Sequence, residues 1–130
     1  MNRDSLLYQD LLEVLISEEQ IHQRVKELGQ QITQDYAGKV PILLGILKGS
    51  FPFLADLMRT IDLHLAVELM GISSYGSTTK SSGVVRITKD LEENVENRHI
   101  LIVEDIVDTG LTINYLLRML RQRNPASLAI

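Results

Sequence analysis

The expected fold of this chain depends on residues 99–112, HILIVEDIVDTGLT. Ile100 to Val103 are consecutive apolar residues, which is typical of a strand buried on both faces of a parallel sheet. Three carboxylates follow this strand directly: Glu104, Asp105 and Asp108. The next residues, Thr109 to Thr112, can begin a helix. A strand, an acidic turn and a helix N-terminus in this order suit the binding of a metal-bound phosphate compound.

The composition limits the class of protein. The length of 130 residues, of which 45% are apolar, predicts one domain spanning residues 1–130. The net charge of −4 and the pI near 5.3 argue against nucleic-acid binding, which normally needs a basic face. The absence of cysteine excludes disulfides and thiolate metal sites. We find neither a signal peptide nor a membrane span, so we expect a cytoplasmic protein that does not contact membranes.

The rest of the chain alternates between helix and strand patterns. Helices are predicted from Ser17 to Tyr36, where a capping box begins the apolar repeat, and over 51–61. Further strands are predicted over 40–47, 64–72, 84–88 and 127–130, and the small polar residues of 73–83 predict a mobile loop.

This order predicts an α/β fold with a mostly parallel sheet flanked by helices. The strands over 40–47 and 99–105 would lie near the middle of the sheet. If their helices leave toward opposite faces, the carboxyl ends of both strands form a crevice. Lys48 and Gly49 would then face the acidic turn across that crevice.

Each motif also has an ordinary structural explanation. The acidic turn and residues 109–112 could simply cap a helix, although three neighbouring carboxylates repel one another unless a cation or hydroxyl donors hold them. Lys48 could bind a phosphate or be an exposed lysine, and it does not belong to a Walker A sequence. The loop over 73–83 could be a lid that excludes water or a plain connection.

Several motifs together resemble one known family. Residues 103–112, VEDIVDTGLT, resemble the diphosphoribosyl-binding signature of the type I phosphoribosyltransferases. Residues 14–19, 45–53 and 73–83 are similar to further motifs of the hypoxanthine branch, in the same order, and the similarity runs from about Leu12 to Ile130. The resemblance implies the type I phosphoribosyltransferase fold and a cytoplasmic, homo-oligomeric enzyme of purine salvage.

The implied reaction needs Mg²⁺. It transfers 5-phosphoribosyl from phosphoribosyl pyrophosphate to N9 of hypoxanthine, or of guanine, and yields IMP or GMP with pyrophosphate. The resemblance assigns Glu104 and Asp105 to the ribose hydroxyls and the Mg²⁺ shell. Asp108 becomes the general acid or base near purine N7, and an aspartate there favours the branch that uses 6-oxopurines.

The remaining implied roles concern substrate binding. Asp108, Thr109, Gly110, Leu111 and Thr112 would hold the 5′-phosphate. Lys48 and Gly49 would contact the pyrophosphate, while Ser74 and Tyr75 would close over the site.

Members of this family continue beyond the position that corresponds to Ile130 and carry residues for the nucleobase there. The resemblance therefore implies a C-terminally truncated chain with impaired catalysis. Two alternatives remain: a nucleotide-binding or RNA-binding regulator of the same fold, which the acidic pI disfavours, and a fragment that binds only phosphoribosyl pyrophosphate.

Overall fold

The computed structural model describes residues 4–74, 85–108 and 110–130. Four helices and five strands are assigned within these ranges: α1 (Leu6–Gln9), α2 (Glu18–Asp35), β1 (Ile42–Leu47), α3 (Phe51–Met58), β2 (Ala66–Ser74), β3 (Val85–Lys89), β4 (His99–Val103), α4 (Leu111–Arg121) and β5 (Ser127–Ala129). No helix among the described residues is both long and apolar enough to span a membrane.

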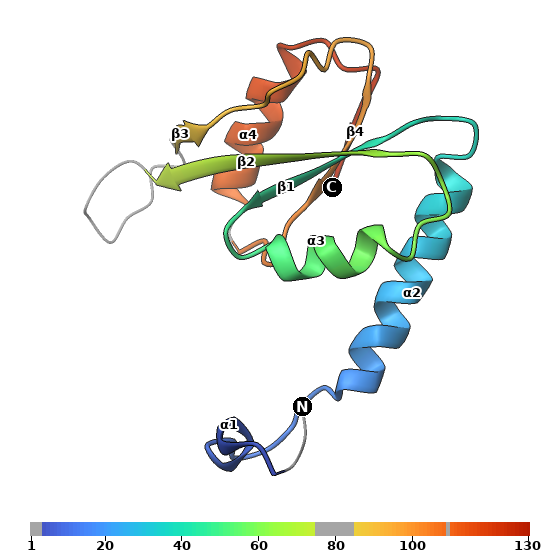
Figure 1. Cartoon of the computed structure of the whole chain (residues 1–130). Coiled ribbons are helices and arrows are strands. Elements are labelled where there is room, and N and C mark those ends of the chain that lie inside the picture. Colours follow the sequence, from blue (N-terminus) through green and yellow to red (C-terminus); the bar gives the residue numbers. More distant parts are fainter. Residues whose placement is uncertain (1–3, 75–84, 109) are drawn as a thin grey trace.

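The five strands form one sheet in the order β3-β2-β1-β4-β5 (Figure 1). Every neighbouring pair is parallel except β2 and β3, which form an antiparallel pair. The central position of β1, with β4 beside it, confirms the mostly parallel α/β sheet and the predicted neighbours. Because parallel strands end at the same edge, the residues that follow β1 and β4 come together.

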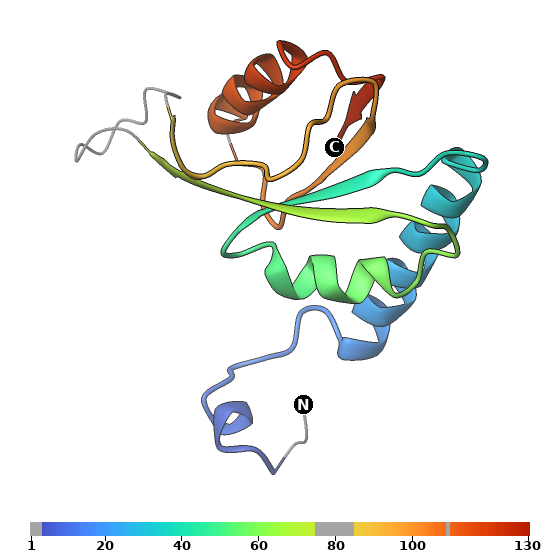
Figure 2. The ribbon, with the colours of Figure 1, turned by 45° about the horizontal axis from the view of Figure 1, so that its top comes forward.

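Helices cover the two faces of the sheet, with α4 on one face and α2 and α3 on the other (Figure 2). Alternate residues of β1 point to opposite faces. Ile42, Leu44 and Ile46 pack with Leu116 and Leu120 of α4. Leu43, on the other face, packs with buried residues of α2 and α3. The two helices that follow the central strands therefore leave toward opposite faces, which meets the condition for a crevice at the carboxyl ends of these strands.

The predicted N-terminus of α2 is confirmed. The backbone N–H of Gln20 donates to Ser17 Oγ at 3.2 Å, and the backbone N–H of Ser17 donates to Gln20 Oε1 at 2.8 Å. This reciprocal capping box satisfies two N–H groups that the first helical turn leaves unpaired. Ahead of it, α1 was not predicted, and Figure 1 shows it lying apart from the sheet.

Several predicted boundaries are wrong, including the start of β1, which is Ile42 instead of residue 40, and the end of the strand predicted over 99–105, which is Val103. Helix α3 ends at Met58 instead of residue 61, since the chain turns there and both the N–H and the hydroxyl of Thr60 donate to the Leu57 carbonyl. Strand β2 begins two residues later than predicted and continues to Ser74. Ser73 and Ser74 are thus not loop residues, because they pair with Arg86 and Val85 of β3. The rest of the predicted loop, 75–83, lies outside the described residues.

Hydrogen bonds and one buried side chain hold the connection from β3 to β4 against the rest of the fold. Val95 is buried in the core on the α4 side. The buried carboxylate of Glu68 accepts from the backbone N–H of Glu93 at 3.2 Å. Arg123, just after α4, donates to both carboxylate oxygens of Asp90 at 2.8 and 2.9 Å. The segment is therefore part of the packed structure.

Candidate functional site

Two turns meet where the central strands β1 and β4 end. The first contains Lys48, Gly49 and Ser50, and the second begins with Glu104 and Asp105. The register pairs Gly45 of β1 with Val103 of β4, so both strands end at nearly the same level. The two turns therefore lie together at one edge of the sheet, where the topology predicts a crevice.

Gly49 lies directly against the carboxylate of Asp105. A Cβ at position 49 would stand 3.0 Å from Asp105 Cγ and 3.3 Å from Oδ1, and it would clash with Oδ2. Any side chain at position 49 would therefore push the Asp105 carboxylate out of its present place. This contact confirms that the two predicted motifs face each other.

Ser50 stabilises the turn at Gly49. This serine is fully buried, and its hydroxyl donates to the carbonyl of Ile46. The backbone N–H groups of Phe51 and Leu54 donate to the carbonyls of Lys48 and Ser50 at 3.1 and 2.8 Å. The bond between Leu47 and Lys48 is cis. The backbone of this turn is thus fixed by the first turn of α3.

The two adjacent carboxylates differ in their electrostatics. Burial raises the pKa of Glu104 to about 7, and its hydrogen bond to Asp105 adds to the rise. The same hydrogen bond lowers the pKa of the exposed Asp105 carboxyl. The backbone N–H of Asp105 also donates to Glu104 Oε1 at 3.0 Å. A cation beside the two carboxyl groups would favour their charged forms and so oppose the rise in the pKa of Glu104.

The helix after the acidic turn begins at a glycine in a left-handed conformation. Gly110 has φ of +82° and forms the N-cap of α4 without a side-chain cap. Its carbonyl accepts from the N–H of Asn114 at 2.8 Å. Leu111 and Thr112 follow in the first helical turn, whose N–H groups and positive dipole end suit an anion.

The structure gives less detail for the other predicted site residues. Lys48 and Asp108 are exposed residues of the two turns. Ser74 ends β2, which lies beside β1 and runs past Gly71, the register partner of Leu47. Ser74 therefore belongs to the same edge of the sheet. The predicted Tyr75 and Thr109 lie outside the described residues.

The described side chains supply only some of the ligands that a magnesium ion needs. Among the described residues, no group of three or more His, Asp or Glu side chains is arranged to hold a metal. Glu104 and Asp105 supply two oxygen-bearing side chains at most. Mg²⁺ is commonly bound by one or two carboxylates, with the remaining ligands coming from substrate phosphates and water. The pair fits a metal that arrives with a phosphorylated substrate.

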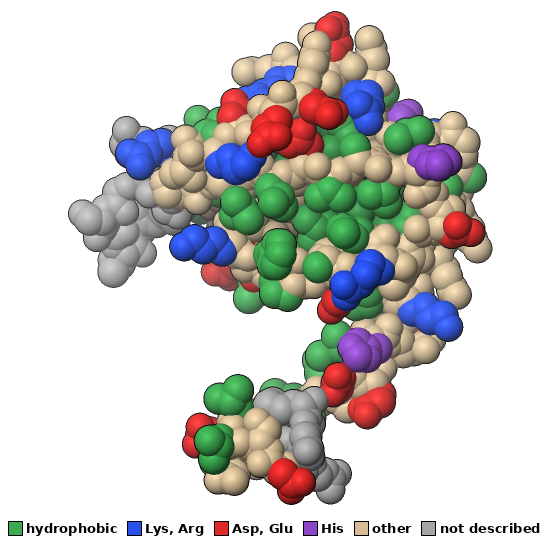
Figure 3. Space-filling view, in the orientation of Figure 1, with side chains coloured by type: hydrophobic (Ala, Val, Ile, Leu, Met, Phe, Trp, Pro, Cys, Tyr) green, Lys and Arg blue, Asp and Glu red, His purple; other side chains and the backbone are tan. Residues whose placement is uncertain are grey.

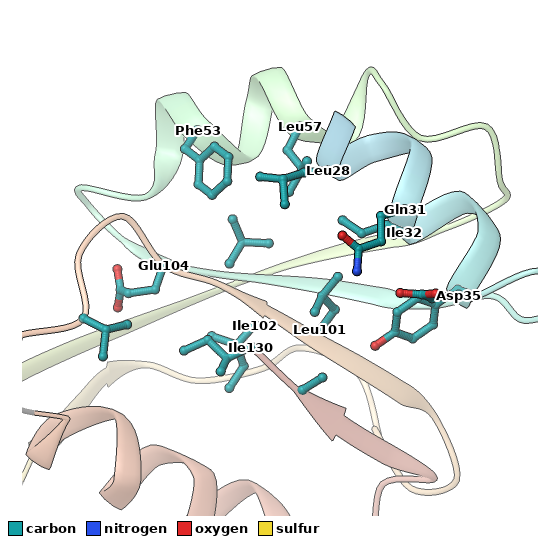
Figure 4. A pocket seen from close by; sticks show the side chains of 14 residues that line it. Leu28, Gln31, Ile32, Asp35, Phe53, Leu57, Leu101, Ile102, Glu104 and Ile130 are labelled. Atoms are coloured by element: carbon teal, nitrogen blue, oxygen red, sulfur yellow. The ribbon is translucent and has the colours of Figure 1, made fainter. Parts of the chain in front are cut away.

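A cavity that sequence reasoning missed adjoins Glu104. It has a volume of about 380 Å³ and is lined mainly by apolar residues of α2, α3 and β4. Figure 4 shows Glu104 at one end of this cavity and Asp35 at the other. Phe53 and Val107 also line it, and the apolar Ile106–Val107 pair inside an acidic turn was the available signal. Glu104 thus lies beside mainly apolar residues, and burial is the largest cause of its raised pKa.

The comparisons with known proteins all indicate the same family. The model of the phosphoribosyl transferase domain matches residues 16–130. The hypoxanthine-guanine phosphoribosyltransferase of Streptococcus mutans is 50% identical over 125 residues, which cover 96% of this chain and 69% of the relative.

Solved structures agree. A hypoxanthine phosphoribosyltransferase of Staphylococcus aureus superposes with a TM-score of 0.93 at 45% identity, covering 99% of this chain and 71% of the other. The hypoxanthine phosphoribosyl transferase of Trypanosoma cruzi, studied for the role of its C-terminal region on oligomeric state and enzymatic activity, superposes with a TM-score of 0.85 at 42% identity. That match covers 92% of this chain and 67% of the other.

Proposed function

This chain belongs to the phosphoribosyl transferase family, and we propose that its crevice transfers 5-phosphoribosyl from phosphoribosyl pyrophosphate to hypoxanthine or guanine. The products are IMP or GMP and pyrophosphate. The contact between Gly49 and the Asp105 carboxylate carries the proposal, because it brings a cationic turn and an acidic turn to one point. The relatives, which are named as transferases, favour this over a regulatory protein.

The donor would lie across the two turns. Lys48 and the Gly49 backbone would contact the pyrophosphate. Glu104 and Asp105 would bind the ribose hydroxyls and, together with substrate oxygens, Mg²⁺, which offsets the negative charge that develops on the leaving pyrophosphate. The segment from Asp108 through Thr109, Gly110, Leu111 and Thr112 would surround the 5′-phosphate, since the N–H groups of a helix N-terminus attract anions. Ser74 and Tyr75 would close over the bound donor.

In the chemical step, one bond to the ribose carbon C1′ forms while another breaks. The lone pair of purine N9 forms the C1′–N9 bond as the bond from C1′ to the pyrophosphate oxygen breaks. Attack by N9 of the purine tautomer that is protonated at N7 leaves a proton on N7, and the Asp108 carboxylate accepts it. Asp108 is an exposed residue of the turn that follows β4, where a purine could reach it.

Two further parts of the proposal concern the setting of the reaction. Phosphoribosyl pyrophosphate carries several negative charges and does not cross a membrane unaided, which supports the cytoplasm as the location. We also expect the protein to form a homo-oligomer.

Nucleotide formation tests the proposal. With Mg²⁺, phosphoribosyl pyrophosphate and hypoxanthine, we expect IMP and pyrophosphate in equal amounts by chromatography. The Asp108→Asn variant should lose about 10²- to 10⁴-fold in rate, the usual contribution of a general acid or base. Its affinity for the donor alone should change far less, because the lost group acts on the purine. An unchanged rate in Asp108→Asn would remove Asp108 from the mechanism.

A further inference from the structure

A groove lies between α2 and the C-terminal end of α3. It has a volume of about 520 Å³, and its lining includes Val25, Lys26 and Gln30 of α2 and Arg59 and Thr60 at the end of α3. We name it the α2–α3 groove. Figure 3 shows blue Lys and Arg side chains and a purple His side chain over α2 and beside the end of α3. Basic side chains therefore gather at this groove.

Close contacts fix α2 against the end of α3. A Cβ at Gly29 of α2 would clash with Thr60 Oγ1 and would stand 2.9 Å from the Thr60 carbonyl oxygen. Thr33 Oγ1 accepts from the backbone N–H of Asp62 at 3.1 Å, which ties the chain after α3 to α2. Val25 is only 8% exposed and gives the groove an apolar floor. The groove is thus already formed, and a ligand would not have to pay for ordering it.

The groove is positively charged although the chain carries a net charge of −4. Among the described residues, no ion pair joins Lys26 to a carboxylate, and its neighbour Glu27 pairs with Arg24 instead, at 3.3 Å. The only carboxylate in the described lining is Asp56, which pairs with Arg59 at 2.6 Å. That bond uses one N–H donor of a guanidinium that has several. Lys26 and Arg59 can therefore both bind an anion.

The positions of the two cations favour a phosphate group. Lys26 and Arg59 come from the two helices that flank the groove, and a tetrahedral phosphate can accept hydrogen bonds from both at once. The Gln30 side chain adds an amide N–H donor. His22 also lines the groove, but it interacts with Glu18 and is not counted here.

The size of the groove indicates what carries the phosphate. A volume of about 520 Å³ lies within the range of sites for small organic molecules and exceeds what a bare phosphate fills. The space over Val25 can hold an organic group beside the phosphate. The ligand class is therefore a small phosphate monoester.

We propose that the α2–α3 groove is a second phosphate-binding site, in which Lys26 and Arg59 hold the phosphate of a small phosphate monoester. The groove lies at the opposite end of α3 from the donor turn. Phe51 begins α3 next to that turn, whereas Arg59 follows its last residue, about 12 Å further along the helix. The site is separate from the two turns at the ends of β1 and β4, so it does not rest on the proposed function.

Amide chemical shifts under titration with ribose 5-phosphate test the site, because they report each position separately. We expect saturable shifts at Val25, Lys26, Gln30 and Thr60. Ribose without phosphate, and chloride at the same ionic strength, should produce no saturable shift there. Inorganic phosphate should shift the same positions but bind more weakly, since it leaves most of the groove empty. Equal or tighter binding of inorganic phosphate would overturn the assignment of a monoester.

Substitutions identify the side chains that hold the phosphate. Lys26→Met and Arg59→Gln should each weaken binding about fivefold or more, the upper end of what an exposed ion pair contributes. Arg24→Gln is the matched control, because it removes the same charge from the same helix outside the groove, and it should change the affinity less than about twofold. Both target side chains are exposed, so the variants should keep the parent fold, which circular dichroism checks.

The same spectra separate this proposal from the proposed function. Shifts in the groove that chloride reproduces, or that survive both Lys26→Met and Arg59→Gln, would overturn the second site. Saturable shifts confined to the start of α4, from Gly110 to Thr112, would also overturn it and would support the proposed function. Shifts in the groove without any at the start of α4 would support the second site and count against the proposed 5′-phosphate site.

Discussion

Replacing Gly49 with alanine should disable the crevice without unfolding the protein. The added Cβ would stand 3.0 Å from Asp105 Cγ, whereas ordinary contact begins near 3.4 Å, and the overlap with Oδ2 is larger. The Asp105 carboxylate, at the end of an exposed side chain, must therefore move away from position 49 by about 1 Å. A displacement of this size in a catalytic arrangement costs about 10²-fold in rate, or about 2.7 kcal/mol of transition-state stabilisation.

The assay is kcat/KM for nucleotide formation, together with the donor dissociation constant by calorimetry. Gly38→Ala is the matched control, since nothing lies within 4 Å of a Cβ there and the residue is remote from both turns. Its φ of +75° makes alanine costly, by about 1 kcal/mol, so the control should lower the melting temperature yet leave donor affinity unchanged. Gly49→Ala should show the opposite pattern.

A double-mutant cycle identifies the cause. If Gly49→Ala acts by displacing Asp105, then it should have little further effect in a chain that already carries Asp105→Ala. Fully additive losses would refute the reasoning, because they would mean that the methyl group acts on something other than the carboxylate.

Three further substitutions test the packing that supports the site. Leu116→Ala, at a fully buried position beneath the sheet, should cost about 2–5 kcal/mol in the free energy of unfolding, measured by denaturant titration; a loss below 1 kcal/mol would contradict the assigned core. Glu68→Ala removes the acceptor for the N–H of Glu93 and should cost about 1–3 kcal/mol, whereas Glu68→Gln should retain part of that stability. The hydrogen bond from Arg123 lowers the pKa of Asp90 below its ordinary value of 3.8, so the pair stabilises the fold above that value and loses its effect as the pH falls through the lowered pKa. Since both side chains are partly exposed, Asp90→Asn should lower the free energy of unfolding by only about 0.5–1 kcal/mol at pH 7. The difference from the parent chain should vanish in acid. A difference that grows in acid would contradict the stabilising role of the charged Asp90.

The sequence predicted the sheet because its signals were local and strong. The apolar run at Ile100–Val103 is typical of a buried strand, and the capping box at Ser17 marks the start of α2. The crevice followed from topology, since parallel strands with crossover helices on opposite faces must leave their carboxyl ends at one edge. That argument placed Gly49 opposite the acidic turn before any distance was known.

What the sequence did not predict depends on contacts between distant residues. Ser73 and Ser74 are small and polar, as in loops, and become strand only because Arg86 and Val85 pair with them. The fastening of the β3–β4 connection needs Glu68 and Arg123, which are far from it along the chain. The raised pKa of Glu104 depends on its burial next to residues of other elements, so no local sequence pattern predicts it.

Amide chemical shifts under titration with Mg²⁺–phosphoribosyl pyrophosphate test the central claim most directly. We expect the largest shifts at Gly49, Asp105 and the start of α4 from Gly110 to Thr112, because the donor should bridge the two turns that end β1 and β4. Signals of α1 should stay unchanged. Saturable shifts that avoid both turns, or none at millimolar donor, would contradict the assignment of this crevice as the phosphoribosyl site.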